Sequence, residues 1–358
     1  MNLVVIILAA LVIIATLLPF VPRDEWWIRD FDFPRLQILV LGAATTVVFP
    51  FTVGFAHWAE TLTFACLVAA VLYQARRVFP YTRMARLEVL PAEHDEAKAS
   101  ISLLVANVLM DNRDSSRLLA TIDARDPDIV LLLEPDSRWE SEMRTIESRY
   151  PATMKRPLDN TYGMLLYSKH QLLDAETRFL INDETPSMRA RLELDTGQTV
   201  RLYCVHPEPP SPTEAPESTE RDAELLMVGK EVEKLDEPVI VCGDLNDVAW
   251  SSTTTLFQKI SGLLDPRKGR GMYSTFNAKI PLMRWPLDHV FVSEHFRFAD
   301  MQRLDKFGSD HFPVYARVIL QPEQKDSQDK PTADADDEAK AEEKLDKAAA
   351  PSDGGPAG

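Results

Sequence analysis

The sequence predicts an α/β sandwich preceded by membrane-spanning helices, and three features of the chain support this fold class. Residues 1–90 contain long apolar runs without charged side chains, and residues 91–320 alternate short apolar segments with helical patterns. Residues 321–358 are rich in Ala, Asp, Glu and Lys. Such a composition cannot offset the entropy cost of ordering. The predicted domains are therefore a membrane region over 1–90, an α/β domain over 91–320 and a disordered acidic tail over 321–358.

The overall composition narrows the class of protein further. The chain has 358 residues and a formal net charge of −16, and its 45% hydrophobic residues are ample material for a buried core. Residues 1–90 are close to neutral, so the negative charge lies on the later domain and the tail. An acidic domain argues against a protein that binds nucleic acid through a large basic surface. Three cysteines cannot form a disulfide scaffold.

Three apolar runs, at 1–22, 36–58 and 61–75, are the candidate membrane spans. About twenty such residues in a helix cross a bilayer. The first run could instead be a cleaved signal peptide, but it has no basic segment and further apolar runs follow it. The third run is short and crosses only if its flanking charged side chains reach the interface. Its alternative interpretation is a buried hairpin packed on the soluble domain.

The orientation of the spans follows from the arginines. With three spans, the 23–35 loop and the domain after residue 76 lie on one side of the membrane. The Arg residues of the first 90 all lie on that side: Arg23, Arg29, Arg35, Arg76, Arg77, Arg83 and Arg86. The positive-inside rule then predicts a cytoplasmic domain, whereas a two-span arrangement reverses the side.

The α/β domain is predicted from short apolar strands with helical patterns between them. The predicted strands are 101–108, 128–133, 163–168, 200–205, 238–242, 289–292 and 313–320. The helical spacing of apolar residues predicts helices over 114–125 and 218–235. Several strands are linked by short turns, which favours a sandwich over pure βαβ winding. The Pro-rich segment 207–217 can be neither helix nor central strand.

Polar side chains recur where these strands end. They are Asn107, Glu134, His206, Asp244, Asn246, Asp288, Asp310 and His311. Taken singly, each is explained as a turn or loop residue. Taken together they predict one cleft, because strand ends bring distant residues to the same edge of a sheet.

The motifs that contain these residues occur in a recognisable order over 99–320. They are Ala106-Asn107-Val108, the 128–134 strand ending in Glu134, Tyr162-Gly163, His206, Gly243-Asp244-Leu245-Asn246, Pro286-Leu287-Asp288-His289 and Ser309-Asp310-His311. In this order they resemble the endonuclease/exonuclease/phosphatase superfamily of metal-dependent phosphoesterases. The apolar spans and the Pro-rich segment after His206 are similar to its membrane-anchored bacterial branch. The resemblance implies a four-layer α/β sandwich of the deoxyribonuclease I type.

The resemblance also implies a divalent cation, Mg²⁺ or Mn²⁺, because phosphate ester hydrolysis needs the phosphoryl oxygens neutralised. Hard oxygen ligands suit these ions. Glu134, with Asn107 adjoining, and Asp310 are the implied metal ligands. In the family, the residue matching Asp244 orients or deprotonates the attacking water, and the residue matching Asn246 holds a phosphate oxygen.

Two histidines are implied to act in acid–base or phosphate contacts. His311 would contact the phosphate or move a proton, with its ring fixed by Asp288. His206 matches a general acid or base of the deoxyribonuclease I and sphingomyelinase branches. Which of the two protonates the leaving group stays open. Arg221, at the start of the predicted 218–235 helix, is the first candidate for a contact with the substrate phosphate.

Two departures from the family pattern limit what the resemblance carries over. Leu109 stands where the apurinic endonuclease branch has an acid, which argues against abasic-site repair. Residues 162–164 contain no acid to support His206, unlike deoxyribonuclease I.

The expected function is a membrane-anchored phosphoesterase with a phosphodiester or phosphomonoester substrate. A nuclease-like activity is the family's commonest, and a lipid-headgroup or sugar-phosphate activity is the alternative. An adaptor without catalytic activity is the alternative of another class. The lipid bilayer is an expected partner, and no protein partner is predicted. Family members often hold this domain in the periplasm, which is opposite to the side that the arginines favour.

Overall fold

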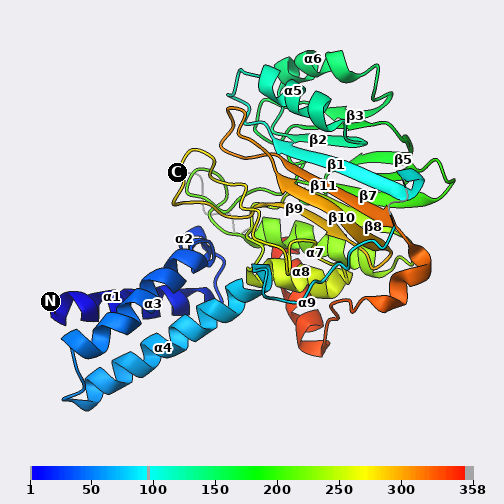
Figure 1. Cartoon of the computed structure of the whole chain (residues 1–358). Helices are drawn as coiled ribbons and strands as arrows, with labels where there is room; N and C mark the ends of the chain where they lie inside the picture. Colours follow the sequence, from blue (N-terminus) through cyan, green and yellow to red (C-terminus); the bar gives the residue numbers. More distant parts are fainter. Residues whose placement is uncertain (1, 95–96, 351–358) are drawn as a thin grey trace.

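Two β-sheets packed face to face, each covered by helices on its outer side, form the body of the protein (Figure 1). The computed structural model describes residues 2–94 and 97–350. From one face to the other, the layers are α5 and α6, the first sheet, the second sheet, then α7 and α8. This is the predicted four-layer α/β sandwich.

The first sheet has six strands in the order β10-β11-β1-β2-β4-β3, and the second has five in the order β5-β6-β7-β8-β9. Only β1 with β2 and β7 with β8 run parallel among the paired strands. The first sheet consists of β10 (Phe296–Arg303), β11 (Val314–Leu320), β1 (Ser100–Asn107), β2 (Ile129–Leu133), β4 (Met164–Ser168) and β3 (Ala152–Arg156). The second consists of β5 (Gln171–Arg178), β6 (Ser187–Glu193), β7 (Thr199–Val205), β8 (Val239–Asp244) and β9 (Asp288–Val292).

Pairing of the strands determines where the polar side chains lie. Asn107 ends β1 opposite Leu133, the last residue of β2, and Glu134 follows directly. Asp244 ends β8 opposite Asp288, the first residue of the antiparallel β9. Both sheets therefore deliver polar residues to one edge of the sandwich, as the strand-end pattern predicts.

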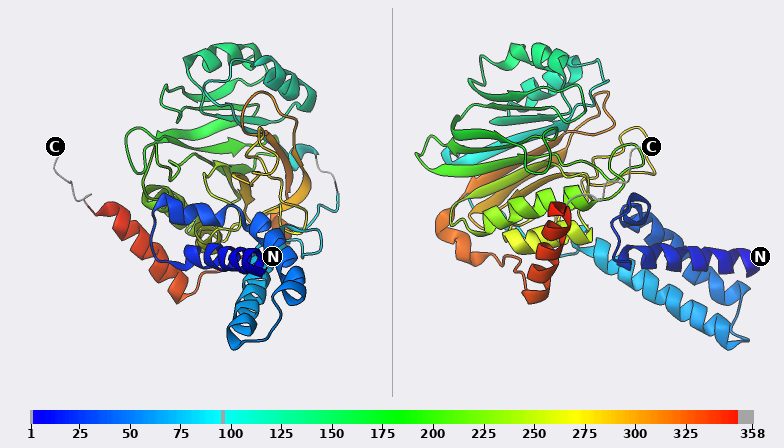
Figure 2. Two further views of the ribbon diagram at one scale, coloured as in Figure 1. Left: turned by 90° about the vertical axis from the view of Figure 1, so that its left-hand side faces the viewer. Right: turned by 180° about the vertical axis from the view of Figure 1, so that it is seen from behind.

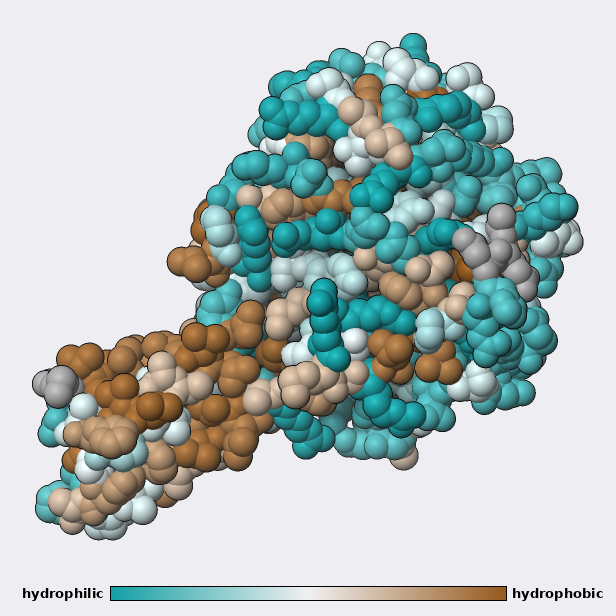
Figure 3. Space-filling model, in the orientation of Figure 1, coloured by the Kyte–Doolittle hydropathy of each residue, from teal (hydrophilic) through white to brown (hydrophobic). Residues whose placement is uncertain are grey.

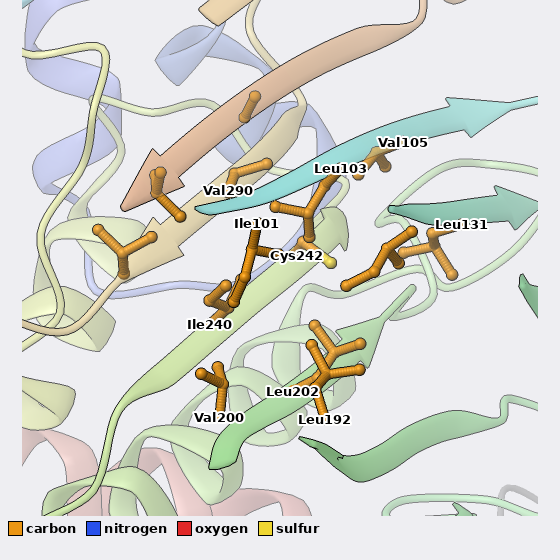
Figure 4. Close-up of a cluster of buried hydrophobic side chains, with 14 of the residues drawn as sticks. Ile101, Leu103, Val105, Leu131, Leu192, Val200, Leu202, Ile240, Cys242 and Val290 are labelled. Carbon is orange, nitrogen blue, oxygen red and sulfur yellow. The ribbon is translucent and has the colours of Figure 1, made fainter. Parts of the chain in front are cut away.

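The main core lies between the two sheets. Side chains of Ile101, Leu103 and Val105 from β1 face Leu202 of β7 and Ile240 of β8, and all are fully buried (Figure 4). Each inward position alternates with one that packs under the outer helices, so these strands are apolar on both faces. This burial holds the strand ends in place.

The outer helices are α5 (Ser116–Arg125), α6 (Ser137–Met143), α7 (Thr219–Glu233) and α8 (Ser252–Ser261). Ser251 begins α8 by accepting a hydrogen bond from the Thr254 N–H, and Gly262 ends it with a φ of 69°, a conformation that glycine adopts without strain. Short 3₁₀ turns complete the chain: η1 (Leu18–Phe20), η2 (Asp30–Asp32), η3 (Phe79–Tyr81), η4 (Ala97–Ala99), η5 (Arg144–Ile146) and η6 (Pro322–Ser327).

An apolar bundle of α1 (Asn2–Leu17), α3 (Arg35–Thr52) and α4 (Trp58–Val78) projects from the sandwich (Figure 3). All three helices, with α1 and α4 extended by η1 and η3, are long and apolar enough to cross a membrane. The third is longer than the predicted run because it includes Arg76 and Arg77 in its last turn. The short α2 (Trp26–Arg29) lies between α1 and α3.

The 23–35 loop is bound to the surface of the sandwich near Pro216, Ser218 and Trp250. Trp26 donates its N–H to the Pro216 carbonyl at 3.0 Å, and Ser218 donates its N–H to the Asp24 carbonyl at 2.8 Å. The indole of Trp250 donates to the Asp32 carbonyl at 2.8 Å. These contacts place the bundle and the sandwich in one fixed arrangement.

The tail differs from the disorder predicted for 321–358. Residues Ala335–Ala349 form α9, which packs across α7 and α8 (Figure 2, right). Its Ala341 is fully buried against Leu226 and Ile260, and its lysines pair with acids of the domain. Composition alone misses this docking because the stabilisation comes from tertiary contacts. Residues 351–358 lie outside the described part.

Candidate active site

A cavity of about 750 Å³ opens at the edge of the sandwich where the strands end. Five of the predicted residues line it: Glu134, His206, Asn246, Asp310 and His311. Asn107, Asp244 and Asp288 are buried beneath it. The structure therefore brings together all the predicted site residues except Arg221. Glu134 and Asp310, which a shared cation requires to face one space, line the same cavity.

Asn107 links the two sheets under the cavity. Its Nδ2 donates to Glu134 Oε1 at 2.6 Å and to Asp244 Oδ2 at 3.2 Å, while its Oδ1 accepts the Leu109 N–H at 3.0 Å. Burial raises the pKa of Glu134 to about 7, against the hydrogen bond from Asn107. The Asn107 amide therefore holds the carboxylates of Glu134 and Asp244 next to each other.

His311 lies between two carboxylates. Its Nδ1 bonds Asp288 Oδ2 at 2.8 Å, and its Nε2 lies 3.5 Å from Asp244 Oδ2. Burial opposes a charge on the ring, but the two carboxylates outweigh it and raise the pKa of His311 to about 10. The ring is therefore held in place and carries a positive charge at neutral pH.

His206 faces the cavity in a neutral form. Burial lowers its pKa to about 4, against the attraction of Asp244. Its Nδ1 is buried and has no hydrogen-bond partner among the described residues. The Tyr162 ring lies 5.7 Å from it, and the Tyr162 hydroxyl bonds Glu214, so no carboxylate supports His206 directly, as the sequence indicates. His206 therefore lines the cavity with one ring nitrogen that no described residue bonds.

The loop after β8 is folded tightly by its own side chains. Asp244 Oδ1 accepts the Asn246 N–H at 2.9 Å, and Asn246 adopts a φ of 49°. Asn246 Nδ2 donates to the Pro207 carbonyl at 2.9 Å, which joins this loop to the segment after His206. Ser309 binds the β1 end in a similar way, since its hydroxyl donates to the Asn107 carbonyl at 2.8 Å.

Arg221 lies elsewhere than predicted. Its guanidinium is 3% exposed and bonds Asp222 through Nε and Nη2, at 3.0 and 2.8 Å, and the Asn246 carbonyl through Nη1, at 2.9 Å. It is not among the residues that line the cavity. This position gives no support to the predicted contact of Arg221 with the substrate phosphate, because the buried Asp222 and Asp247 hold the side chain behind the loop; the contact stays a prediction.

Two further buried residues also support this loop: Asp247, which the sequence reasoning missed, and His289, from the Pro286-Leu287-Asp288-His289 motif. Asp247 accepts hydrogen bonds from Ser251 and Thr254, and its carbonyl lies 2.9 Å from His289 Nε2. The other nitrogen of His289 faces Arg267 Nη2 at 2.6 Å. The signal available in the sequence was that Asp247 lies four residues before Ser251, a typical first residue of a helix.

The donor set fits a divalent cation. Ligand atoms of Asp244, Asp288 and His311 lie within 4.8 Å of one another. Glu134 and Asp310 add carboxylate oxygens on the cavity side. Oxygen donors in excess of nearby positive charge suit a hard cation such as Mg²⁺ or Mn²⁺. The group could therefore bind a metal ion.

The comparisons with known proteins agree with this geometry. The facing mixed sheets and the acidic pocket at their strand ends define the fold of a metal-dependent phosphoester hydrolase. Residues 104–311 match the endonuclease/exonuclease/phosphatase family, which is more than half of the chain. The chain belongs to this family. A comparison with curated protein sequences finds no match.

Solved structures show the same fold at low sequence identity. The chain is similar to an endonuclease/exonuclease/phosphatase from Beutenbergia cavernae (17% identity, TM-score 0.50, 63% of this chain and 72% of that one). It is also similar to the human Nocturnin catalytic domain (16% identity, TM-score 0.51, 68% of this chain and 99% of that one). A third similar structure is D. rerio TDP2 complexed with a single-strand DNA product (19% identity, TM-score 0.50, 62% of this chain and 100% of that one).

Proposed function

We propose that the protein is a membrane-anchored hydrolase of phosphate esters that uses Mg²⁺ or Mn²⁺, of the membrane-anchored bacterial branch of its family. The observation that carries the proposal is the convergence of carboxylates and His311 around one cavity. Three apolar helices beside that cavity support the membrane anchor. An adaptor without activity would have no need for such a set of buried, mutually bonded acids, whose burial is costly.

Carboxylates would hold the cation and orient the attacking water. Glu134 and Asp310, with Asn107 adjoining, would hold the cation, which when bound neutralises phosphoryl oxygens. Asp244 would orient the attacking water, since its carboxylate lies under the cavity and is fixed by Asn107 and the Asn246 N–H. Burial raises the pKa of Asp244, but the nearby His311 and His206 outweigh this and lower it, which keeps the carboxylate able to accept a proton.

The remaining polar groups would bind the phosphate and the leaving oxygen. His311, positively charged and positioned by Asp288, would donate to a phosphoryl or leaving oxygen. Asn246 would hold a phosphate oxygen from the opposite side of the cavity. His206 is neutral and would accept or relay a proton at Nδ1 or Nε2.

The test is hydrolysis of bis-p-nitrophenyl phosphate and p-nitrophenyl phosphate by the full chain in detergent. We expect activity with Mg²⁺ or Mn²⁺, loss with EDTA, and a fall of at least about 100-fold in Asp244→Asn and His311→Gln. Asp195→Asn removes an exposed carboxylate and is the matched control. Activity that persists in both site variants would show that the catalytic residues lie elsewhere.

The side of the membrane is tested separately. Green fluorescent protein, which does not fluoresce after export in an unfolded state, is fused to the C-terminus. The arginine distribution predicts fluorescence and thus a cytoplasmic domain. Absence of fluorescence from a stably expressed fusion supports the periplasmic side that the family resemblance favours.

Two substrate classes follow from the sequence, a nucleic acid and a lipid or sugar phosphate. The nuclease-like alternative draws on the family's commonest activity and on the DNA product bound to D. rerio TDP2. The lipid alternative draws on the bundle, since an anchor raises the local concentration of membrane-bound substrate. The lining of the cavity supplies a further argument on the choice between them.

A further inference from the structure

The cavity has a wall that does not belong to the α/β sandwich. Asp30, Phe33 and Pro34, from the segment that connects the first two candidate spans, and Gln37, in the first turn of α3, line it together with the strand-end residues. This wall is fixed in place by the backbone contacts of the 23–35 loop and by the edge-to-face contact of Phe33 with Trp285, whose ring centroids lie 5.6 Å apart. The cavity is therefore shared between the membrane region and the sandwich.

Next to this wall is an exposed apolar loop, residues 277–284, which we name the lip. Ile280, Leu282 and Met283 expose apolar side chains to solvent, and that of Leu282 is 84% exposed. The lip touches the membrane region directly, because Gln37 Nε2 donates to the Leu282 carbonyl at 2.8 Å. In Figure 1 the gold loops around it extend toward the same side of the sandwich as the bundle.

The lip has the composition of a segment that enters a bilayer surface. Its apolar tip is flanked by Lys279 and Arg284. Exposed apolar side chains on a loop cost free energy in water, and basic residues next to them favour an anionic lipid surface. The apolar surface of the bundle continues on the same side (Figure 3). The rim formed by the lip and the start of α3, which we name the mouth, therefore lies on the membrane side of the cavity.

The charge of the cavity lining argues against a nucleic acid. Of the described residues that line it, none is Lys or Arg, and four are acids: Asp30, Glu134, Glu214 and Asp310. Proteins that bind single-stranded nucleic acids use a positively charged groove along the backbone. A bound cation could balance one phosphate here but not a row of them. Apolar side chains such as Phe33, Leu282 and Trp285 suit a substrate with a long apolar part.

We propose that the substrate is the phosphate ester of a membrane lipid, which enters the cavity from the bilayer surface at the mouth, beside the hydrogen bond of Gln37 with the Leu282 carbonyl. This inference rests on the hydrolase function and the membrane anchor proposed above. Water supplies the oxygen that bonds to phosphorus, the ester P–O bond breaks, and the released alcohol takes a proton. The lipid chains remain in the bilayer while the phosphate reaches Asp244 and His311.

The test uses the full chain in phosphatidylcholine nanodiscs that contain phosphatidylglycerol as a diester and phosphatidic acid as a monoester. Lipid products are measured by mass spectrometry, beside bis-p-nitrophenyl phosphate and a single-stranded oligodeoxynucleotide. We expect hydrolysis of one of the two lipids, with a kcat/KM above that for the oligonucleotide. Faster hydrolysis of the oligonucleotide, or hydrolysis of the soluble ester alone, would overturn the inference and leave the proposed function intact.

Variants of the lip give the second measurement. Leu282→Asp, or Ile280→Asp as an independent change, should lower the ratio of lipid to soluble-ester hydrolysis at least about tenfold, because each removes apolar contact with the bilayer. Met84→Asp is the matched control, since Met84 is 85% exposed and does not line the cavity; its ratio should stay unchanged. An unchanged ratio in both lip variants would refute the inference. No hydrolysis of any ester would refute the proposed function itself.

Discussion

Replacing Arg221 tests whether this residue supports the active-site loop or binds the substrate. The guanidinium makes hydrogen bonds of 2.8–3.0 Å to Asp222 and to the Asn246 carbonyl, and lies 3.7 Å from Asp247. Arg221→Met leaves these buried acids without their main countercharge. Loss of one partner of a buried ion pair costs about 3–5 kcal/mol. Because Asp222 keeps Lys344 at 2.7 Å, we expect a value near the lower end.

That cost has two measurable consequences. A loss of about 3 kcal/mol lowers the melting temperature by roughly 6–12 °C for a domain of this size. Displacement of the Asn246 backbone, next to Asp244, should lower kcat for bis-p-nitrophenyl phosphate at least about tenfold with little change in KM. Thermal unfolding in detergent and steady-state kinetics measure the two effects.

A matched variant and one opposite outcome complete this test. Arg189→Met removes a partly exposed arginine that pairs with Glu176, and should cost less than about 1 kcal/mol. If Arg221→Met instead keeps the melting temperature of the wild type and raises KM, the side chain reaches the substrate phosphate. The original prediction from the sequence would then be right and the supporting role wrong.

Three further predictions concern a buried acid, the tail and the metal. Burial raises the pKa of Glu224 to about 8, so this group ionises at a lower pH in the unfolded chain than in the folded one, and the free energy of unfolding falls between about pH 4.5 and 8. In thermal unfolding, Glu224→Gln should therefore be more stable than the wild type by several kcal/mol at about pH 9 and by almost nothing at about pH 5. An equal gain at both pH values would contradict this. Ala341→Asp places a charge in a fully buried position and should expose 321–350 to limited proteolysis, whereas Ala339→Asp, on the exposed face, should not; equal protection in both would mean that α9 does not dock. Mg²⁺ or Mn²⁺ at 100 times its dissociation constant should add about 2.7 kcal/mol of stability, and Glu134→Gln should lose most of this gain while Asp195→Asn keeps it.

The central strands were predictable because burial on both faces leaves continuous apolar runs. Strands β1, β2 and β8 fall within one or two residues of their predicted bounds. Strands β3, β5, β6 and β10 were missed. In β5 no side chain is buried, and the position of the strand depends on backbone pairing with β6. The hydrophobic pattern carries information on burial, and an exposed edge strand has little of it.

The sequence predicted which strand-end residues come together at the site, but not the direction in which each long side chain points. Strand ends and spacing brought together Glu134, His206 and Asp310, because parallel pairing fixes which residues share an edge. The sequence could not indicate that Arg221 points away from the cavity. The direction of a long side chain depends on which buried acids it meets, and Asp222 and Asp247 compete with any substrate for its guanidinium.

The sequence also separated two parts that the structure joins at one cavity. Residues 23–35 read as a short connection between spans, and the lip reads as an ordinary loop, because neither carries a motif. Their proposed roles in forming the cavity depend on tertiary contacts, such as the hydrogen bond that Gln37, two residues after the 23–35 segment, donates to the Leu282 carbonyl of the lip. The acids and histidines at the strand ends provide chemistry for a phosphate ester of any kind. Specificity must then come from the mouth, where apolar side chains and the absence of lysine and arginine among the described lining residues favour a phosphate that the membrane delivers.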